Sequence, residues 1–157
     1  MKLKEWLNKW HMDSLKINAK FLELELKFEE ADKKAAWELY IELITRTTTQ
    51  HLPVEHGIEI TALESVHKIF DLTRVIIKEN GRKCFEFTKI AIVVLNQVIR
   101  PFAAKWHKLS SEGAFNDKKQ CKKFRKELAS LQVDLRKYTQ MLSDMAGVED
   151  LTDLMEV

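Results

Sequence analysis

Arg100 and His107 are the two residues of this sequence whose types and spacing best suit acid–base chemistry. They bound the segment Arg-Pro-Phe-Ala-Ala-Lys-Trp-His. Their spacing corresponds to about two turns of an α-helix, so both side chains would lie on one helix face. A histidine can transfer a proton near neutral pH, and an arginine can stabilise the negative charge of a phosphorane. The pair therefore suits metal-independent cleavage of RNA.

The spacing of this pair resembles the R-x(4–6)-H motif of HEPN domains. These domains are all-helical bundles, and many are RNases of bacterial defence and toxin systems. The resemblance implies RNase activity, with Arg100 and His107 as catalytic residues. It covers only these two residues, and it departs from the family pattern at Pro101, where a polar residue usually follows the arginine. The alternative role of Arg100 is structural, as the ion-pair partner of a carboxylate such as Glu86.

Basic residues also gather between residues 105 and 126, where the only acids are Glu112 and Asp117. Trp106 lies among them, and tryptophan is a frequent anchor for partner proteins. The candidate partner-binding or phosphate-binding residues are Lys105, Trp106, Lys108, Lys118, Lys119, Lys122, Lys123, Arg125 and Lys126. A nucleic-acid contact is one function of such a surface, and a solvated charged face is the alternative. The net charge of +2 favours neither.

The C-terminal segment has the opposite charge. Residues 140–157 contain five acids and no lysine or arginine, so the acids lie toward the negative end of a long helix expected over 117–146. Apolar residues alternate with the charges after Gly147. We expect the acidic tail, residues 146–157, to dock onto the bundle or onto a partner protein.

Metal and cofactor sites are not predicted. His51, Glu55 and His56 fall in one loop and His67 in the next helix, but no histidine pair has the spacing of rigid helical zinc ligands. The sequence also lacks a glycine-rich phosphate loop and a nucleophile elbow. Cys84 and Cys121 are expected to be free, buried thiols of a cytoplasmic protein, with a single disulfide as the alternative.

Length and composition predict one all-α domain over residues 1–157. The chain has only four glycines and two prolines, which favours few, long elements. The longest apolar run, Ile90 to Leu95, is far shorter than the roughly 20 residues that span a bilayer. We therefore expect no membrane segment.

Hydrophobic periodicity predicts a bundle of four to five principal helices. Residues 84–108 are apolar on nearly all sides and are expected at its centre, with a kink or a new helix at Pro101. Residues 117–146 have apolar residues in steps of three and four, which indicates a helix with a heptad seam. The seam residues are Cys121, Phe124, Leu128, Leu131, Leu135, Tyr138, Leu142 and Met145.

Residues 18–28 have a different pattern. Polar and apolar side chains alternate from Phe21 to Phe28, which predicts one short strand at the edge of the bundle. This strand would pair with residues 14–18 or with a second subunit. A homodimer would form through this segment or through an aromatic N-terminal helix containing Trp6 and Trp10, which is too apolar to remain uncovered.

These features predict a non-catalytic interaction or regulatory protein that docks a protein partner within a larger assembly. The first alternative is the RNase that uses Arg100 and His107. The second is a nucleic-acid-binding module that uses the lysines of residues 118–126.

Overall fold

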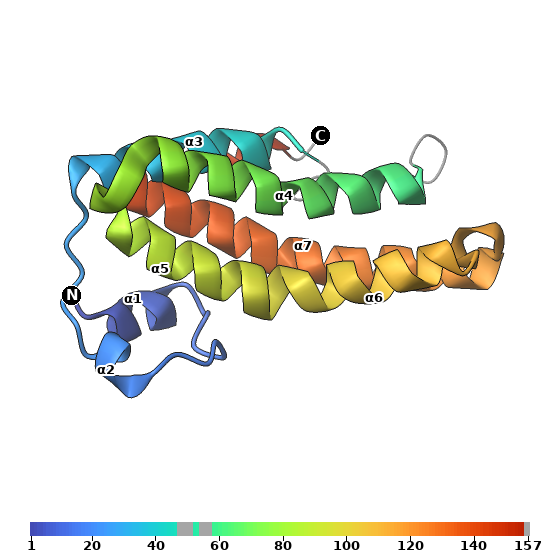
Figure 1. Cartoon of the computed structure of the whole chain (residues 1–157), viewed down its shortest axis with the longest axis horizontal. Helices are drawn as coiled ribbons and strands as arrows, with labels where there is room; N and C mark the ends of the chain where they lie inside the picture. Colours follow the sequence, from blue (N-terminus) through green and yellow to red (C-terminus); the bar gives the residue numbers. More distant parts are fainter. Residues whose placement is uncertain (47–51, 54–57, 156–157) are drawn as a thin grey trace.

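The computed structural model describes residues 1–46, 52–53 and 58–155, and it confirms the all-α helical bundle. Four long helical segments run side by side along the long axis of the molecule (Figure 1). They are α3 (Glu30–Ile44), α4 (Glu59–Asn80), the continuous segment of α5 (Phe85–Val94) and α6 (Arg100–Ser111), and α7 (Lys118–Ala146). The short helices α1 (Leu3–Lys9) and α2 (Ala19–Leu22) lie beside one end of this bundle.

The heptad seam of α7 forms the centre of the core, as predicted. The seam residues from Phe124 to Met145 are buried, whereas the seam residue Cys121 at the start of the helix is half-buried. Helix α7 packs along α3, and α4 packs along both α3 and α6. Each helix therefore buries its apolar stripe against neighbouring helices of the same chain.

Helix ends follow local sequence signals in most places. Gly81 after α4 and Gly147 after α7 have φ values of 74° and 71°, as expected for glycines that end helices. Asp117 caps α7 by accepting a hydrogen bond from the Lys119 N–H at 3.0 Å. Helix α4 is an exception: it starts at Glu59 after its N-cap Ile58, whose side chain makes no capping hydrogen bond.

The junction between α5 and α6 is continuous. Residues Leu95–Ile99 form a π-helical turn directly before α6. Pro101 has no N–H and cannot continue a regular hydrogen-bond ladder, and a π-turn is one way to absorb that loss within a helix. In place of the expected kink or new helix, α5 and α6 form one continuous helical segment with a locally widened turn.

The rod formed by α5 and α6 is not covered on all sides, which corrects the expectation for residues 84–108. Phe87, Val94 and Ile99 are fully buried, but Phe85 is 60% exposed and Ile92 is 49% exposed. Among the described residues, the helix Phe85–Ser111 is long and apolar enough by composition to cross a membrane, and 39% of its most apolar window is buried in the bundle. Core packing accounts for part of its hydropathy.

The predicted strand near residues 18–28 is wrong. Residues 19–22 form the short helix α2, and residues 1–3 meet residues 24–26 in a single antiparallel bridge between Lys2 and Glu25. Only the two extended residues before α1 are available for pairing, so no ladder develops. Alternation in this segment reflects partial burial of Leu22, Leu26 and Phe28 against the bundle.

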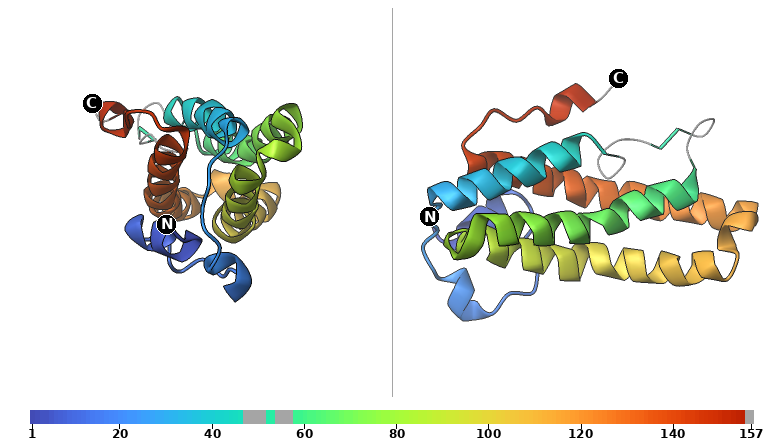
Figure 2. Two further views of the ribbon diagram at one scale, coloured as in Figure 1. Left: turned by 90° about the vertical axis from the view of Figure 1, so that its left-hand side faces the viewer. Right: turned by 45° about the horizontal axis from the view of Figure 1, so that its top comes forward.

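The aromatic N-terminal helix is covered by its own chain. The indole N–H of Trp6 donates to Asp144 Oδ2 at 2.6 Å, and its ring meets Phe28 edge-on with centroids 5.5 Å apart. The end-on view in Figure 2 shows α1 beside the bundle near the end of α7. Trp6 therefore needs no second subunit to bury it, and homodimerisation stays a prediction.

The acidic tail docks onto the bundle, one of the two expected outcomes. The Tyr40 hydroxyl on α3 accepts a hydrogen bond from the Leu151 N–H at 2.6 Å and donates to Asp150 Oδ1 at 3.3 Å. Thr152 is buried in this contact. Figure 2 shows this segment crossing above the bundle after α7 ends.

Candidate functional site

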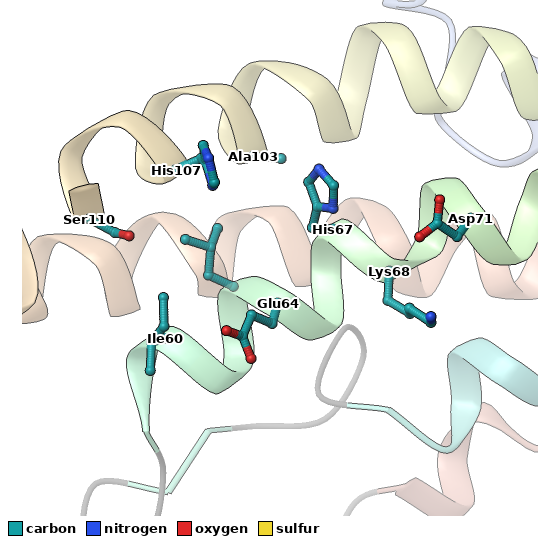
Figure 3. A pocket seen from close by; sticks show the side chains of 9 residues that line it. Ile60, Glu64, His67, Lys68, Asp71, Ala103, His107 and Ser110 are labelled. Atoms are coloured by element: carbon teal, nitrogen blue, oxygen red, sulfur yellow. The ribbon is translucent and has the colours of Figure 1, made fainter.

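Polar side chains converge on a groove between α4 and α6. It consists of two adjoining pockets of about 340 and 210 Å³ that share His67, Ala103 and His107. We call it the α4–α6 groove. Figure 3 shows His67 on α4 and His107 on α6 at the rim of the larger pocket. Arg74 and Arg100 line the smaller pocket.

The antiparallel arrangement of α4 and α6 explains why these four side chains meet. In α4 the order is His67 and then Arg74, whereas in α6 it is Arg100 and then His107. Both pairs have a seven-residue spacing, which places each pair on one helix face. The two helices run in opposite directions (Figure 1). His67 therefore lies against His107, and Arg74 and Arg100 line the same small pocket.

The two histidine rings lie nearly parallel, with centroids 6.3 Å apart and an interplanar angle of 29°. Both residues are exposed at the surface. Ala103 contributes only a methyl group between the helices, which leaves room between the longer side chains. The rings can therefore reach a ligand that enters the groove from solvent.

Arg100 is held in position by neighbours other than an acid. Its Nε donates to Asn96 Oδ1 at 3.1 Å, and its guanidinium carbon lies 4.8 Å from the centre of the Phe70 ring. The suggested ion pair with Glu86 is wrong, because that carboxylate binds Lys89 at 2.8 Å. The aromatic contact orients the guanidinium while leaving its charge without a carboxylate partner in these contacts.

Arg74 has an acidic neighbour on its own helix. Its guanidinium donates to Asp71 Oδ1, and this hydrogen bond lowers the pKa of the Asp71 carboxyl below its ordinary value. Lys68 and Glu64 also line the groove. The groove thus combines two arginines, two histidines and a lysine with two carboxylates.

Trp106 is not available to a partner, which corrects its prediction as an anchor. Its side chain is fully buried and packs edge-on against Phe124 with ring centroids 5.2 Å apart. It also stacks on Phe115 at 6.0 Å. Trp106 is therefore a core residue of the contact between α6 and α7.

Arg125 is also a structural residue. Its Nε donates to Glu59 Oε1 at 2.8 Å, and one terminal nitrogen donates to the Leu52 and Pro53 carbonyl oxygens at 3.1 and 3.2 Å. These contacts connect the start of α7 to the start of α4 and to residues 52–53. Its prediction as a partner-binding residue therefore loses its support.

The remaining predicted bases are exposed lysines around the turn between α6 and α7. Lys105 forms an ion pair with Glu127 at 2.5 Å. The other exposed lysines of this set are Lys108, Lys118, Lys119, Lys122, Lys123 and Lys126. Since Trp106 is buried, this surface can contact a ligand only through charge and aliphatic stems.

A second surface, which the sequence did not single out, lies where α2 meets α5. Phe21 is 43% exposed, beside the exposed Phe85 and Ile92. The Lys89 ammonium lies 4.8 Å from the Phe85 ring centre and 5.7 Å from that of Phe21. These four residues, which we call the α2–α5 face, adjoin an apolar pocket of about 240 Å³.

The cysteines and the suggested metal ligands add no reactive centre in the described ranges. Cys84 and Cys121 are free thiols, and burial raises the pKa of Cys121. No group of three or more histidine, cysteine or acidic residues that could hold a metal occurs in the described residues. His51, Glu55 and His56 lie outside them.

Sequence reasoning found one half of the groove and missed the other. Arg100 and His107 do line one pocket, as the helical spacing predicts. Arg74 is not part of that prediction, and His67 enters it only as a candidate metal ligand. The repeated seven-residue spacing in α4 was the available signal, but it acquires meaning only once α4 and α6 are known to be neighbours.

Comparison with protein families, curated proteins and solved structures finds no match for this chain.

Proposed function

We propose that this chain is a non-catalytic interaction protein that docks a protein partner on the α2–α5 face. The observation that carries this proposal is the exposure of Phe85 and Ile92 on a helix whose other side lies in the core. With Phe21 they form a cluster of large apolar side chains in contact with water. Clusters of this kind in soluble proteins typically mark binding surfaces, and aromatic residues dominate their energetics.

The charge in this surface specifies the partner. Lys89 lies against both aromatic rings, and its side chain is 20% exposed. A partner that covers the rings would also cover this ammonium group and its ion-pair partner Glu86. The matching surface is an amphipathic helix with apolar side chains and a carboxylate that shares Lys89 with Glu86. A cytoplasmic location and membership of a larger assembly belong to the same proposal.

The test begins with a photo-crosslinking residue at position 92 in the native host, followed by reconstitution of the captured partner from purified proteins. Phe85→Glu and Ile92→Glu should each weaken the reconstituted complex at least about tenfold, since each places a charge in a buried apolar contact. Lys34→Glu on α3, an exposed position away from this face, is the matched control and should leave the affinity unchanged. Unchanged affinity in both face variants, or crosslinks only to another copy of this chain, would refute the proposal.

The RNase function remains a second candidate, supported by one specific observation. Arg100 and His107 line a single pocket. If this function holds, the purified chain cleaves single-stranded RNA without added metal, and His107→Ala abolishes cleavage while Lys34→Ala does not. Cleavage that persists in His107→Ala would exclude it.

A further inference from the structure

We propose that the α4–α6 groove is a binding site for a phosphate group, held between Arg74 and Arg100 and bordered by His67 and His107. This site is separate from the α2–α5 face and does not depend on the proposed docking function. It adds His67 and Arg74 of α4 to the pair of Arg100 and His107 that the sequence indicates.

The first support is convergence of donors from opposite walls. Arg74 on α4 and Arg100 on α6 both line the pocket of about 210 Å³, and both histidines line the same pocket. A phosphate group presents several oxygens at its surface, so it can accept hydrogen bonds from both walls at once. Arginine is the side chain best suited to this task, because its planar guanidinium can donate two parallel hydrogen bonds.

The second support is orientation of the guanidinium groups. Arg100 lies over the Phe70 ring and donates to the neutral Asn96 side chain, so its position is determined without an acid that would neutralise it. One nitrogen of Arg74 binds Asp71, which holds that side chain on the α4 wall. Less conformational freedom is then lost when a ligand binds.

The third support is the local balance of charge. The pocket that contains both arginines is lined by His67, Phe70, Arg74, Arg100, Ala103, Ala104 and His107 and by no carboxylate. Glu64 and Asp71 line the adjoining pocket instead, near Lys68. An anion in the smaller pocket therefore meets the two guanidinium groups and the two imidazole rings, while Asp71 binds one nitrogen of Arg74 from the adjoining pocket.

Titration calorimetry of the full chain at low salt would test this site with inorganic phosphate, a nucleoside monophosphate and a short single-stranded RNA. We expect saturable binding of at least one of these probes. Arg74→Gln and Arg100→Gln should each weaken it roughly tenfold, the effect expected for loss of one charge-assisted contact. The double variant should show no saturable binding.

Lys34→Gln is the matched control, because it removes one exposed positive charge from α3 outside the groove. Its affinity should match that of the unmodified chain, and circular dichroism should show that all variants keep their helical content. If phosphate binds as well as the nucleotide, the site recognises the free anion; tighter binding of the nucleotide or RNA assigns it to a phosphate ester. Equal affinity in the arginine variants, or no binding of any probe, would overturn the proposal.

This experiment also separates the site from the other two functions. Saturable binding of phosphate supports the site. If the single-stranded RNA probe also stays intact when it is incubated with the chain, cleavage is excluded. Phe85→Glu should bind phosphate normally, so a failure of partner docking would leave this result unaffected.

Discussion

The carboxylate of Asp32 on α3 accepts a hydrogen bond from the backbone N–H of Phe87 on α5 at 3.0 Å. Its other oxygen accepts from the Glu29 N–H at 2.9 Å, at the start of α3. Asp32 is 1% exposed, so one buried side chain satisfies unpaired amides at the first turns of two helices.

Replacement of Asp32 by alanine should lower the free energy of unfolding by about 2–4 kcal/mol, because it leaves one buried and one partly buried N–H donor without an acceptor. Urea denaturation followed by circular dichroism measures this loss. The control is Glu30→Ala, which removes an exposed carboxylate from the same helical turn. A loss no larger than that of the control would show that water replaces Asp32 at both amides.

The buried position of the Trp106 indole can be tested by comparing its replacement with that of an exposed residue on the same helix. Trp106→Ala should destabilise the chain by about 3–5 kcal/mol, because it opens a cavity beside Phe115 and Phe124. Trp106→Phe should cost less, since it keeps an aromatic ring there. Thermal unfolding compares both with Lys108→Ala on the exposed side of α6. A Trp106→Ala variant as stable as Lys108→Ala would contradict the buried position of the indole.

The tail contact depends on the hydroxyl of Tyr40. Burial raises the pKa of this phenol, so it stays neutral near physiological pH and can donate to Asp150 while accepting from Leu151. Tyr40→Phe should cost about 1 kcal/mol and speed hydrogen exchange at the Leu151 amide. Asp153→Asn, an exposed change in the same tail, is the control. Unchanged exchange in Tyr40→Phe would mean that apolar contacts alone hold the tail.

The pair of Arg74 and Asp71 makes a prediction for pH. The pKa of Asp71 lies below its ordinary value of 3.8, so the pair stabilises the fold above that pH and loses its effect as pH falls through the lowered pKa. Arg74→Gln should raise this pKa toward 3.8, as measured by NMR titration of the carboxyl carbon. Lys78→Gln, one helical turn farther along α4, should leave it lowered. If the pKa of Asp71 is unchanged in Arg74→Gln, a group other than Arg74 is the cause of its lowering.

Local signals in the sequence were enough to predict the long helices. The apolar steps of α7, the cap at Asp117 and the glycines after α4 and α7 act within a few residues of chain, so they can be read without knowledge of neighbours. Asp32 shows the limit of such local signals. It lies inside the first turn of α3, and one of its carboxylate oxygens accepts from α5, which is distant in sequence.

By itself, the sequence determined the all-α class, a bundle of four to five principal helices and the shared face of Arg100 and His107. The tertiary structure decided which faces are covered: Trp106 lies inside, Phe85 lies outside, and Arg125 is used within the fold. It alone brought His67 and Arg74 to the α4–α6 groove. The physical reason is that helical periodicity identifies an apolar stripe and its opposite face, whereas burial and the meeting of polar side chains depend on which helices become neighbours and in which direction they run.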